Sequence, residues 1–286
     1  MKNFTIKDLE RFSGVKAHTL RTWEHRYAVL KPMRSSGNTR FYSVEDLNKI
    51  LRIAFLNRFG HRISNLSRLS EIEIDDKIRA LSLDESSKWQ KAILDLAISM
   101  YSEDAESFEN LLNELLRFWQ IEILVEKILY PFLVNTSLLW TGHKFYEEHM
   151  VVTAARQKLL YATERVPIAK NSPESVLLFL PDNKQLDLGL LYSHYFLKRR
   201  GFRVLYMGID VTLDNLQSVL QFHSFSYIFT YLKPVAQPTI DSILSLIRLH
   251  SPGAKLVIAD YQIPAPPPVI KEDLVKLSFQ DALLFI

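Results

Sequence analysis

Residues 20–27 read Leu-Arg-Thr-Trp-Glu-His-Arg-Tyr, and this stretch decides how the first quarter of the chain is interpreted. Leu20 and Trp23 lie three positions apart, so a helix turns both toward one inner face. A Leu-Lys-Pro step follows at 30–32, and an Arg-Phe-Tyr triplet stands at 40–42. The proline fixes the entry of the segment, and the Ser-Ser-Gly-Asn run before the triplet favours a turn. The stretch therefore predicts a helix followed by a small two-stranded wing.

A shorter helix is predicted immediately before this stretch. Thr5 suits an N-cap, and the apolar residues within 6–12 recur at helical spacing. Gly14 then supplies the backbone freedom that a tight turn needs. Two helices joined by so short a turn predict a helix-turn-helix whose second helix covers residues 16–27.

A further helix is predicted after the wing. Ser43 and Asp46 form a Ser-x-x-Asp pair, which caps the first backbone N–H groups of a helix. Apolar residues recur at helical spacing over 47–54, and Gly60 interrupts the pattern before a short helix that follows Arg62.

Basic residues are concentrated at the N-terminal end of the chain. Residues 1–70 contain 14 Lys and Arg against 5 Asp and Glu, whereas the remainder contains 21 against 27. A basic head on an acidic body is the expected electrostatic footprint of a DNA-binding module. The alternative is a solvated basic surface without a partner.

The order of these motifs resembles the MerR family of bacterial transcription regulators. The match comprises the Leu-Arg-x-Trp-Glu-x-Arg-Tyr pattern, the Leu-Lys-Pro step and the Arg-x-Tyr end of the wing, within residues 1–72. The resemblance implies a winged helix-turn-helix that binds a palindromic promoter site in double-stranded DNA as a homo-oligomer, either a dimer or a tetramer. It also implies regulation by promoter occlusion or by distortion of promoter DNA.

Nine residues of the head are candidates for DNA contact. In such a domain the exposed start of the second helix contacts base edges and phosphates, and the wing contacts phosphates. The candidates are Lys16, His18, Thr19, Arg21, Arg26, Arg34, Arg40, Tyr42 and Arg62. A packed ion pair with Glu24 or another neighbour is the alternative for Arg21 and Arg26, whereas Trp23 is expected in the core.

Residues 75–167 predict a helical bundle. Apolar residues recur at helical spacing over 93–100, 111–116 and 121–128. Asp104 and Pro131 predict helix boundaries within this region.

From residue 173 the pattern alternates between strand and helix. The expected strands cover 176–180, 203–207, 227–230, 256–259 and 274–277, and the expected helices cover 187–200, 213–222 and 240–250. Ser278 and Asp281 predict the cap of a last short helix. Such alternation predicts a parallel sheet covered on both faces. The fold class is therefore multidomain: a winged helix-turn-helix at 1–72, a bundle at 75–167 and a flavodoxin-like α/β domain at 173–286.

The end of the bundle resembles the helical domain of cobalamin-dependent photoreceptor regulators, the CarH/LitR group. The resemblance rests on Trp140-Thr141-Gly142 and on the pair Glu148-His149. It implies that Trp140 and the Glu-His pair face the upper ligand of cobalamin, although the intervening segment 141–147 is shorter here than in that group. His143, Glu148 and His149 could also suggest a metal site, but three such residues in a polar turn are common by chance, so no metal site is predicted.

The α/β region resembles the cobalamin-binding domain of the same group, but its motifs are altered. The loop that reads Glu-x-His-x-x-Gly in the family stands here at 184–189, with Leu186 in place of the cobalt-binding histidine. Leucine has no lone pair to give a metal. Asp187 and Gly189 remain. The serine-rich stretch and the Gly-Gly of the family read Thr-Tyr-Leu-Lys at 230–233 and Ala-Asp at 259–260.

These departures favour a regulator that uses its C-terminal domains for oligomerisation or regulation without cobalamin. The first alternative is a repressor that responds to cobalamin or another small ligand, with a response to light as one form of it. The second is control by a regulatory protein partner. No catalytic constellation is recognisable, so no enzyme is predicted. The chain lacks cysteine, which excludes thiolate-based metal or iron–sulfur sensing. No apolar run is long enough for a membrane helix, and a cytoplasmic protein is expected.

Overall fold

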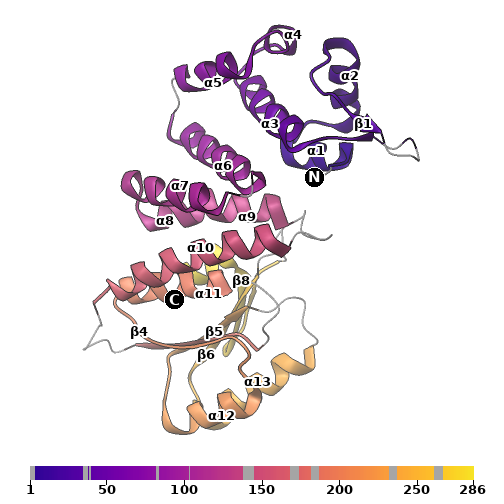
Figure 1. Cartoon of the computed structure of the whole chain (residues 1–286). Coiled ribbons are helices and arrows are strands. Elements are labelled where there is room, and N and C mark those ends of the chain that lie inside the picture. The colour runs from indigo at the N-terminus through magenta and orange to yellow at the C-terminus, as the bar shows by residue number, and fades with distance from the viewer. Residues whose placement is uncertain are drawn as a thin grey trace. The chain divides into compact units, whose positions relative to one another are not determined.

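A computed structural model describes residues 4–34, 38, 40–81, 84–102, 104–137, 145–167, 174–181, 187–231, 237–260 and 267–286 (Figure 1). They form two compact units, Met1–Ala154 and Ala155–Ile286. The head and most of the following helices share the first unit, and the boundary falls inside a long helix. The finer division into three domains remains a prediction.

The first unit begins with the expected winged helix-turn-helix. Its elements are α1 (Ile6–Ser13), α2 (Ala17–Tyr27), β1 (Met33–Arg34), β2 (Arg40–Phe41), α3 (Val44–Arg58) and α4 (Ile63–Leu66). Strands β1 and β2 pair antiparallel, with Met33 opposite Phe41. The prediction of a helix, a wing and a further helix is confirmed.

Local capping and one glycine explain why these helices begin and turn where they do. Thr5 and Ser43 each accept a hydrogen bond from a backbone N–H three residues on, and Asp8 and Asp46 return a bond to the cap backbone. Gly14 has φ +70°, and a Cβ there would lie 3.0 Å from the Arg58 guanidinium. The turn between α1 and α2 therefore requires glycine.

The rest of the first unit is helical. Its elements are α5 (Glu71–Ala80), α6 (Glu85–Tyr101), α7 (Ala105–Phe118), α8 (Ile121–Ile123), the π-helix η1 (Leu124–Leu129), α9 (Tyr130–Ser137) and the first half of α10 (Phe145–Glu164). Asp104 caps α7, as predicted, by accepting from the Ser107 N–H at 2.9 Å.

The expected helix boundary at Pro131 is wrong, because the helix continues through it. The π-helical turn η1 lies immediately before, and the Tyr130 N–H bonds to the Val125 carbonyl five residues back. This wider turn changes the hydrogen-bond register next to the proline, so its missing N–H and its ring are accommodated without a break.

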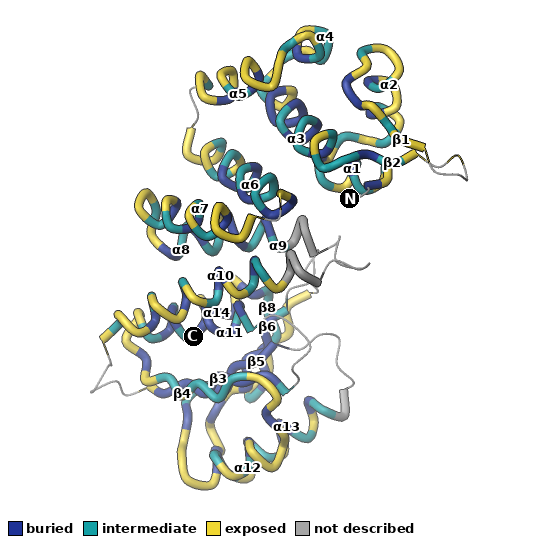
Figure 2. The backbone as a smooth tube through the Cα atoms, in the orientation of Figure 1, coloured by how far each residue is buried: buried dark blue, intermediate teal, exposed yellow. Residues whose placement is uncertain are grey.

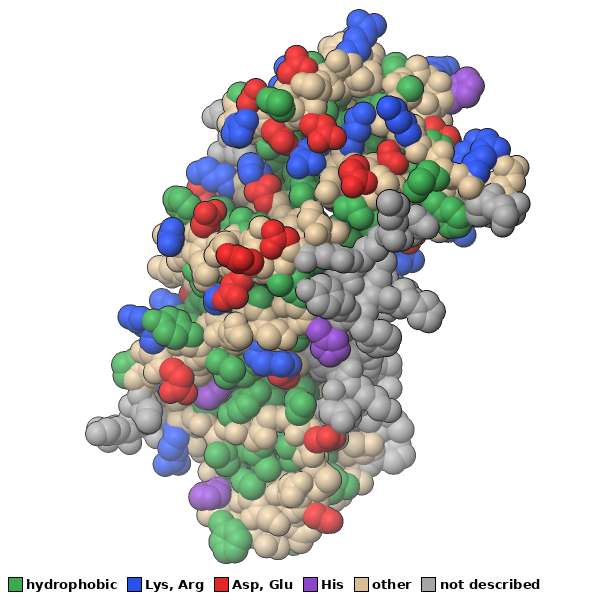
Figure 3. Space-filling view, viewed as in Figure 1, with side chains coloured by type: hydrophobic (Ala, Val, Ile, Leu, Met, Phe, Trp, Pro, Cys, Tyr) green, Lys and Arg blue, Asp and Glu red, His purple; other side chains and the backbone are tan. Residues whose placement is uncertain are grey.

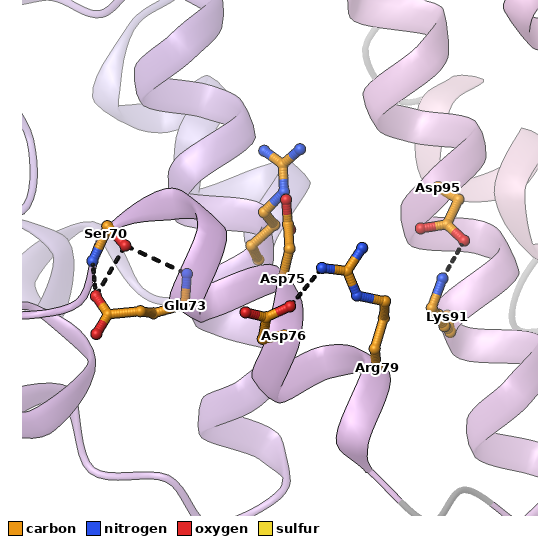
Figure 4. A network of polar contacts seen from close by, with 8 residues as sticks. Ser70, Glu73, Asp75, Asp76, Arg79, Lys91 and Asp95 are labelled. Atoms are coloured by element: carbon orange, nitrogen blue, oxygen red, sulfur yellow. Dashed lines mark hydrogen bonds and ion pairs between the residues drawn. The ribbon is translucent and has the colours of Figure 1, made fainter.

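Helices α5 and α6 carry a set of polar contacts (Figure 4). Ser70 and Glu73 form the capping box of α5, and Asp76 pairs with Arg79 on its exposed side. On α6, Lys91 donates to Asp95 at 2.6 Å, while burial raises the pKa of Asp95. Across the helices, Arg52 of α3 pairs with Asp75 of α5 at 2.9 Å. A cleft of about 510 Å³ between α3, α5, α6 and α7 is bordered by five of these groups, Arg52, Asp75, Arg79, Lys91 and Asp95.

The second unit is the expected α/β fold. Its elements after α10 are β3 (Ser175–Phe179), α11 (Asp187–Arg199), β4 (Arg203–Gly208), α12 (Leu213–Phe222), β5 (Tyr227–Tyr231), α13 (Gln237–His250), β6 (Lys255–Asp260), β7 (Val269–Ile270), β8 (Leu274–Ser278) and α14 (Phe279–Phe285). The sheet order is β4-β3-β5-β6-β8-β7, parallel except for the pairing of β7 with β8. All five predicted strands are found, whereas the two-residue strand β7 was not predicted.

Helices cover both faces of this sheet. Helices α12 and α13 pack on one face, around a core that includes Leu216, Ile228 and Ile243. Helix α11 lies on the opposite face, and the central strands β3, β5 and β6 are largely buried (Figures 1 and 2). Chain order reverses between β3 and β5, and the carboxyl ends of the strands at such a switch point are where open α/β sheets bind ligands.

None of the helices in the described part of the chain is both long enough and apolar enough to cross a membrane.

Candidate DNA-binding surface and cofactor region

Helix α2 presents one buried and one exposed face. Leu20 and Trp23 are buried, as expected for the inner face of a recognition helix. The predicted contact residues Lys16, His18, Arg21 and Arg26 are exposed, and Thr19 is half-buried. No side chain caps the first turn of α2, in contrast to α1 and α3. Its first N–H groups therefore remain available alongside the basic side chains.

Glu24 ties the wing to this helix. Its Oε2 accepts a hydrogen bond from the Tyr42 hydroxyl at 2.7 Å, and its Oε1 lies 3.3 Å from the Arg40 Nε. Tyr42 is completely buried, and its pKa is raised by burial and then by the bond to Glu24. The structure thus brings Arg40 and Tyr42 together, but it places Tyr42 inside the head and not on the surface.

The remaining candidate arginines are exposed. Arg34 donates to the Asn38 side chain at 2.6 Å within the wing, and Arg40 keeps 46 % of its side chain exposed. Arg62 is exposed at the start of α4, which packs on α2. Within the described residues no ion pair involves Arg21 or Arg26. The ion pair with Glu24 is formed by Arg40 instead. Figure 3 shows Lys and Arg side chains reaching the surface of the head at the top of the view.

Sequence reasoning missed Glu24 as the organiser of this surface. Glu24 lies 18 residues from Tyr42. No periodic pattern connects residues so far apart, and the only available signal was that a glutamate stands within an otherwise basic and aromatic stretch.

The cofactor region predicted from the resemblance is described only in part. Trp140 and Leu186 lie outside the described residues, as does His143. Glu148 and His149 belong to α10, where His149 is exposed, and nothing is described of the Glu148 side chain. Within the described part of the chain no group of three His, Asp or Glu side chains could hold a metal ion.

Asp187 and Gly189 lie in the first turn of α11, directly after the switch-point loop. The Asp187 carboxylate accepts two hydrogen bonds from Arg156 of α10, from Nε and Nη2, each at 2.8 Å. Further along the same helices, Lys198 donates to the Thr163 carbonyl at 2.8 Å. These contacts hold the end of α10 on α11. The Asp187 carboxylate therefore already has Arg156 as its partner.

Tyr231 forms a wall at the switch point together with Ser193 of α11 and Phe279 of α14. It is the last residue of β5, only 8 % exposed, and its hydroxyl lies 2.8 Å from the Ser193 hydroxyl of α11. Ser193 in turn donates to the Gly189 carbonyl at 2.8 Å. The Tyr231 ring packs 5.6 Å from Phe279, the first residue of α14.

The resemblance to the cobalamin-binding domain implies small residues where the chain leaves its third strand. Here a phenol ring fills the space between β5, α11 and α14. Tyr192 of α11 adds a second buried ring, 6.2 Å from Phe279. The observed packing is that of a filled core.

A half-buried aromatic pair joins α11 to the edge strand β4. His194 stacks on Tyr206 of β4 with ring centres 5.1 Å apart. Burial, with a smaller contribution from Lys198, lowers the pKa of His194 to about 4, and burial raises that of Tyr206 to about 12. Both side chains are therefore neutral near pH 7, which suits a packing role.

Comparison with known proteins supports the interpretation of the head and of the rest of the chain. Residues 4–71 match the family described as MerR HTH family regulatory protein. Two relatives from Myxococcus xanthus cover most of the chain. The HTH-type transcriptional repressor CarA is 26 % identical over 213 residues, which is 74 % of this chain and 70 % of CarA. The HTH-type transcriptional repressor CarH is 24 % identical over 225 residues, 75 % of this chain and 74 % of CarH.

A solved structure supports the fold of the remainder. The monomethylamine corrinoid protein of Methanosarcina barkeri superposes with a TM-score of 0.53 at 13 % identity, covering 68 % of this chain and 97 % of that one. At that identity the likeness shows the fold alone. The chain is thus similar to transcription repressors, its residues 4–71 match the MerR helix-turn-helix family, and the rest of the chain is similar in fold to a corrinoid protein.

Proposed function

We propose that this regulator binds promoter DNA through the exposed basic face of its head. The observation that carries the proposal is the Glu24 junction, which fixes Arg40 of the wing to α2. The same helix exposes His18 and Arg21, with Lys16 at its start. Arg26, Arg34 and Arg62 extend the face. Thr19 is a half-buried member of the same helix, whereas Tyr42 supports the face from within.

The proposed assembly is a homo-oligomer, a dimer or a tetramer, acting on promoter DNA in the cytoplasm. A palindromic site requires two heads whose recognition helices lie about one DNA turn, roughly 34 Å, apart. Because the two relatives are named repressors, we propose repression by promoter occlusion, and a regulatory role rather than catalysis.

Arg21→Ala and Arg40→Ala are expected to weaken DNA binding and to flatten its salt dependence. Each lost phosphate contact should reduce the slope of log K against log salt by roughly 0.9. The measurement is fluorescence anisotropy with a DNA site selected by the wild-type protein from a random library, over a range of KCl concentrations.

Arg117→Ala is the matched control, because Arg117 is an exposed arginine at the end of α7. It should leave both affinity and slope unchanged. Wild-type slopes in both head variants would remove Arg21 and Arg40 from the interface.

We further propose that the α/β domain acts without cobalamin. Leu186 supplies no cobalt ligand, Asp187 is occupied by Arg156, and Tyr231 fills the wall at the switch point. The corrinoid-protein fold of this region favours the competing function, a regulator that senses a corrinoid.

Cobalamin retention separates these two functions. After incubation with adenosylcobalamin in the dark and desalting, the protein is expected to be colourless and to bind its selected DNA as before. A corrinoid-binding protein treated in parallel serves as the positive control. Retention near one equivalent would establish the sensor function and reject the cobalamin-independent one.

A further inference from the structure

Phe4 links the wing to the core of the first unit. Its backbone forms an isolated antiparallel bridge with Tyr42, with N–H···O distances of 2.9 Å in both directions. Its ring is completely buried. The bridge extends the end of β2 by one pairing, so the position of Phe4 and the position of the wing depend on each other.

The ring of Phe4 packs on the helical part of the unit. Tyr101, the last residue of α6, is 2 % exposed and lies edge-on to Phe4 with ring centres 5.7 Å apart. Phe12 of α1 completes the cluster, 4.7 Å from Tyr101 and 5.8 Å from Phe4. Edge-to-face aromatic contacts of this kind contribute about 0.5–1.5 kcal/mol each beyond the area that they bury.

A continuous series of contacts therefore runs from α6 to the recognition helix. Tyr101 packs on Phe4, Phe4 pairs with Tyr42, and Tyr42 donates to Glu24 of α2. Glu24 also holds Arg40. Every member except Glu24 and Arg40 is buried, so displacement of one is transmitted by packing to the next.

The wing needs such external support. Its strands β1 and β2 comprise two residues each, and an isolated two-stranded hairpin is marginally stable at best in water. We infer that Tyr101 is a positioning residue for the DNA-binding head: its ring holds Phe4, and through Phe4 it fixes the wing against α2. The bundle thereby sets the geometry of a surface that it does not itself form.

Tyr101→Ala tests this role in the full chain. The variant is expected to bind the selected DNA about tenfold more weakly, with an unchanged salt slope because no phosphate contact is removed. Hydrogen exchange measured by mass spectrometry should become faster in peptides covering residues 30–45. Tyr101→Phe keeps the ring and should restore both properties.

Phe108→Ala is the matched control. Phe108 of α7 is also completely buried, but it packs on Phe132 of α9 and makes no ring contact with Phe4. It should lower stability while leaving exchange in residues 30–45 unchanged. Equal exchange and equal affinity in the two alanine variants would overturn the inference, since Tyr101 would then be an ordinary core residue.

Tyr101→Leu keeps the test decisive if the alanine variant does not fold. It retains apolar volume but removes the edge-to-face contacts, so an intermediate increase in wing exchange is expected, and wild-type exchange would overturn the inference. The exchange measurement does not require DNA, so a failure of the proposed promoter binding remains distinguishable from a failure of this role.

Discussion

Glu24→Ala is expected to lower DNA affinity by tenfold or more, which corresponds to at least about 1.4 kcal/mol. The substitution releases Arg40 and removes the acceptor of the buried Tyr42 hydroxyl. A buried donor left without a partner costs about 1–3 kcal/mol of folding free energy. Both stability and affinity should therefore fall, although no candidate DNA contact has been replaced. Urea unfolding and anisotropy titration measure the two quantities.

A double-mutant cycle isolates the cause. Tyr42→Phe alone removes one hydrogen bond and should cost about 1 kcal/mol. In the Glu24→Ala background the same change should be neutral or stabilising, because it removes the orphaned hydroxyl. Purely additive effects would contradict the proposed junction.

Asp76→Ala is the control for charge removal. Asp76 pairs with Arg79 on the exposed side of α5, where both side chains are more than half exposed. Such surface pairs often contribute nothing measurable. The variant should therefore match the wild type in stability and DNA affinity.

Features encoded by neighbouring residues could be predicted from the sequence. Thr5, Ser43, Asp104 and Ser278 cap their helices through groups only three residues away. The helix-turn-helix follows from local periodicity, and the parallel sheet follows from the alternation of strands and helices.

Features that join distant residues could not be predicted. The Arg156–Asp187 pair spans 31 residues and the Ser193–Tyr231 contact spans 38. Nothing in either local stretch indicates its partner. The sequence identified the altered cofactor motifs as substitutions, but only the fold shows that Tyr231 turns inward to α11 and α14. Strand β7 was missed because two residues are too few to show alternation.

The same distinction between local and distant contacts explains why Tyr42, predicted as a DNA contact, is assigned a different role. Tyr42 ends a basic wing, and its position in the sequence favours a phosphate contact. Its actual neighbours are Phe4 and Glu24, which lie far away along the chain. The role proposed for Tyr42 in DNA binding is therefore to fix the geometry of the residues that reach the surface.

Tyr231→Ala is expected to destabilise the α/β unit by about 3–5 kcal/mol, the usual cost of truncating a large buried aromatic side chain. The centre of the Tyr231 ring lies 5.5 Å from that of Phe229 and 5.6 Å from that of Phe279. Its removal therefore leaves a cavity between the sheet, α11 and α14. Tyr231→Phe should cost only about 0.5–1.5 kcal/mol. Ser193 would still donate to the Gly189 carbonyl in that variant. Thermal or urea unfolding followed by circular dichroism measures both.

Tyr227→Ala provides the comparison on the same strand. Tyr227 points to the same face, where it meets Phe285, but it is only half-buried. Its truncation should cost clearly less than that of Tyr231. If Tyr231→Ala were as stable as the wild type, the ring would fill no essential space and the wall at the switch point could open to a ligand. A large loss in Tyr231→Ala with a small loss in Tyr231→Phe would instead show that the protein uses this space for its own core.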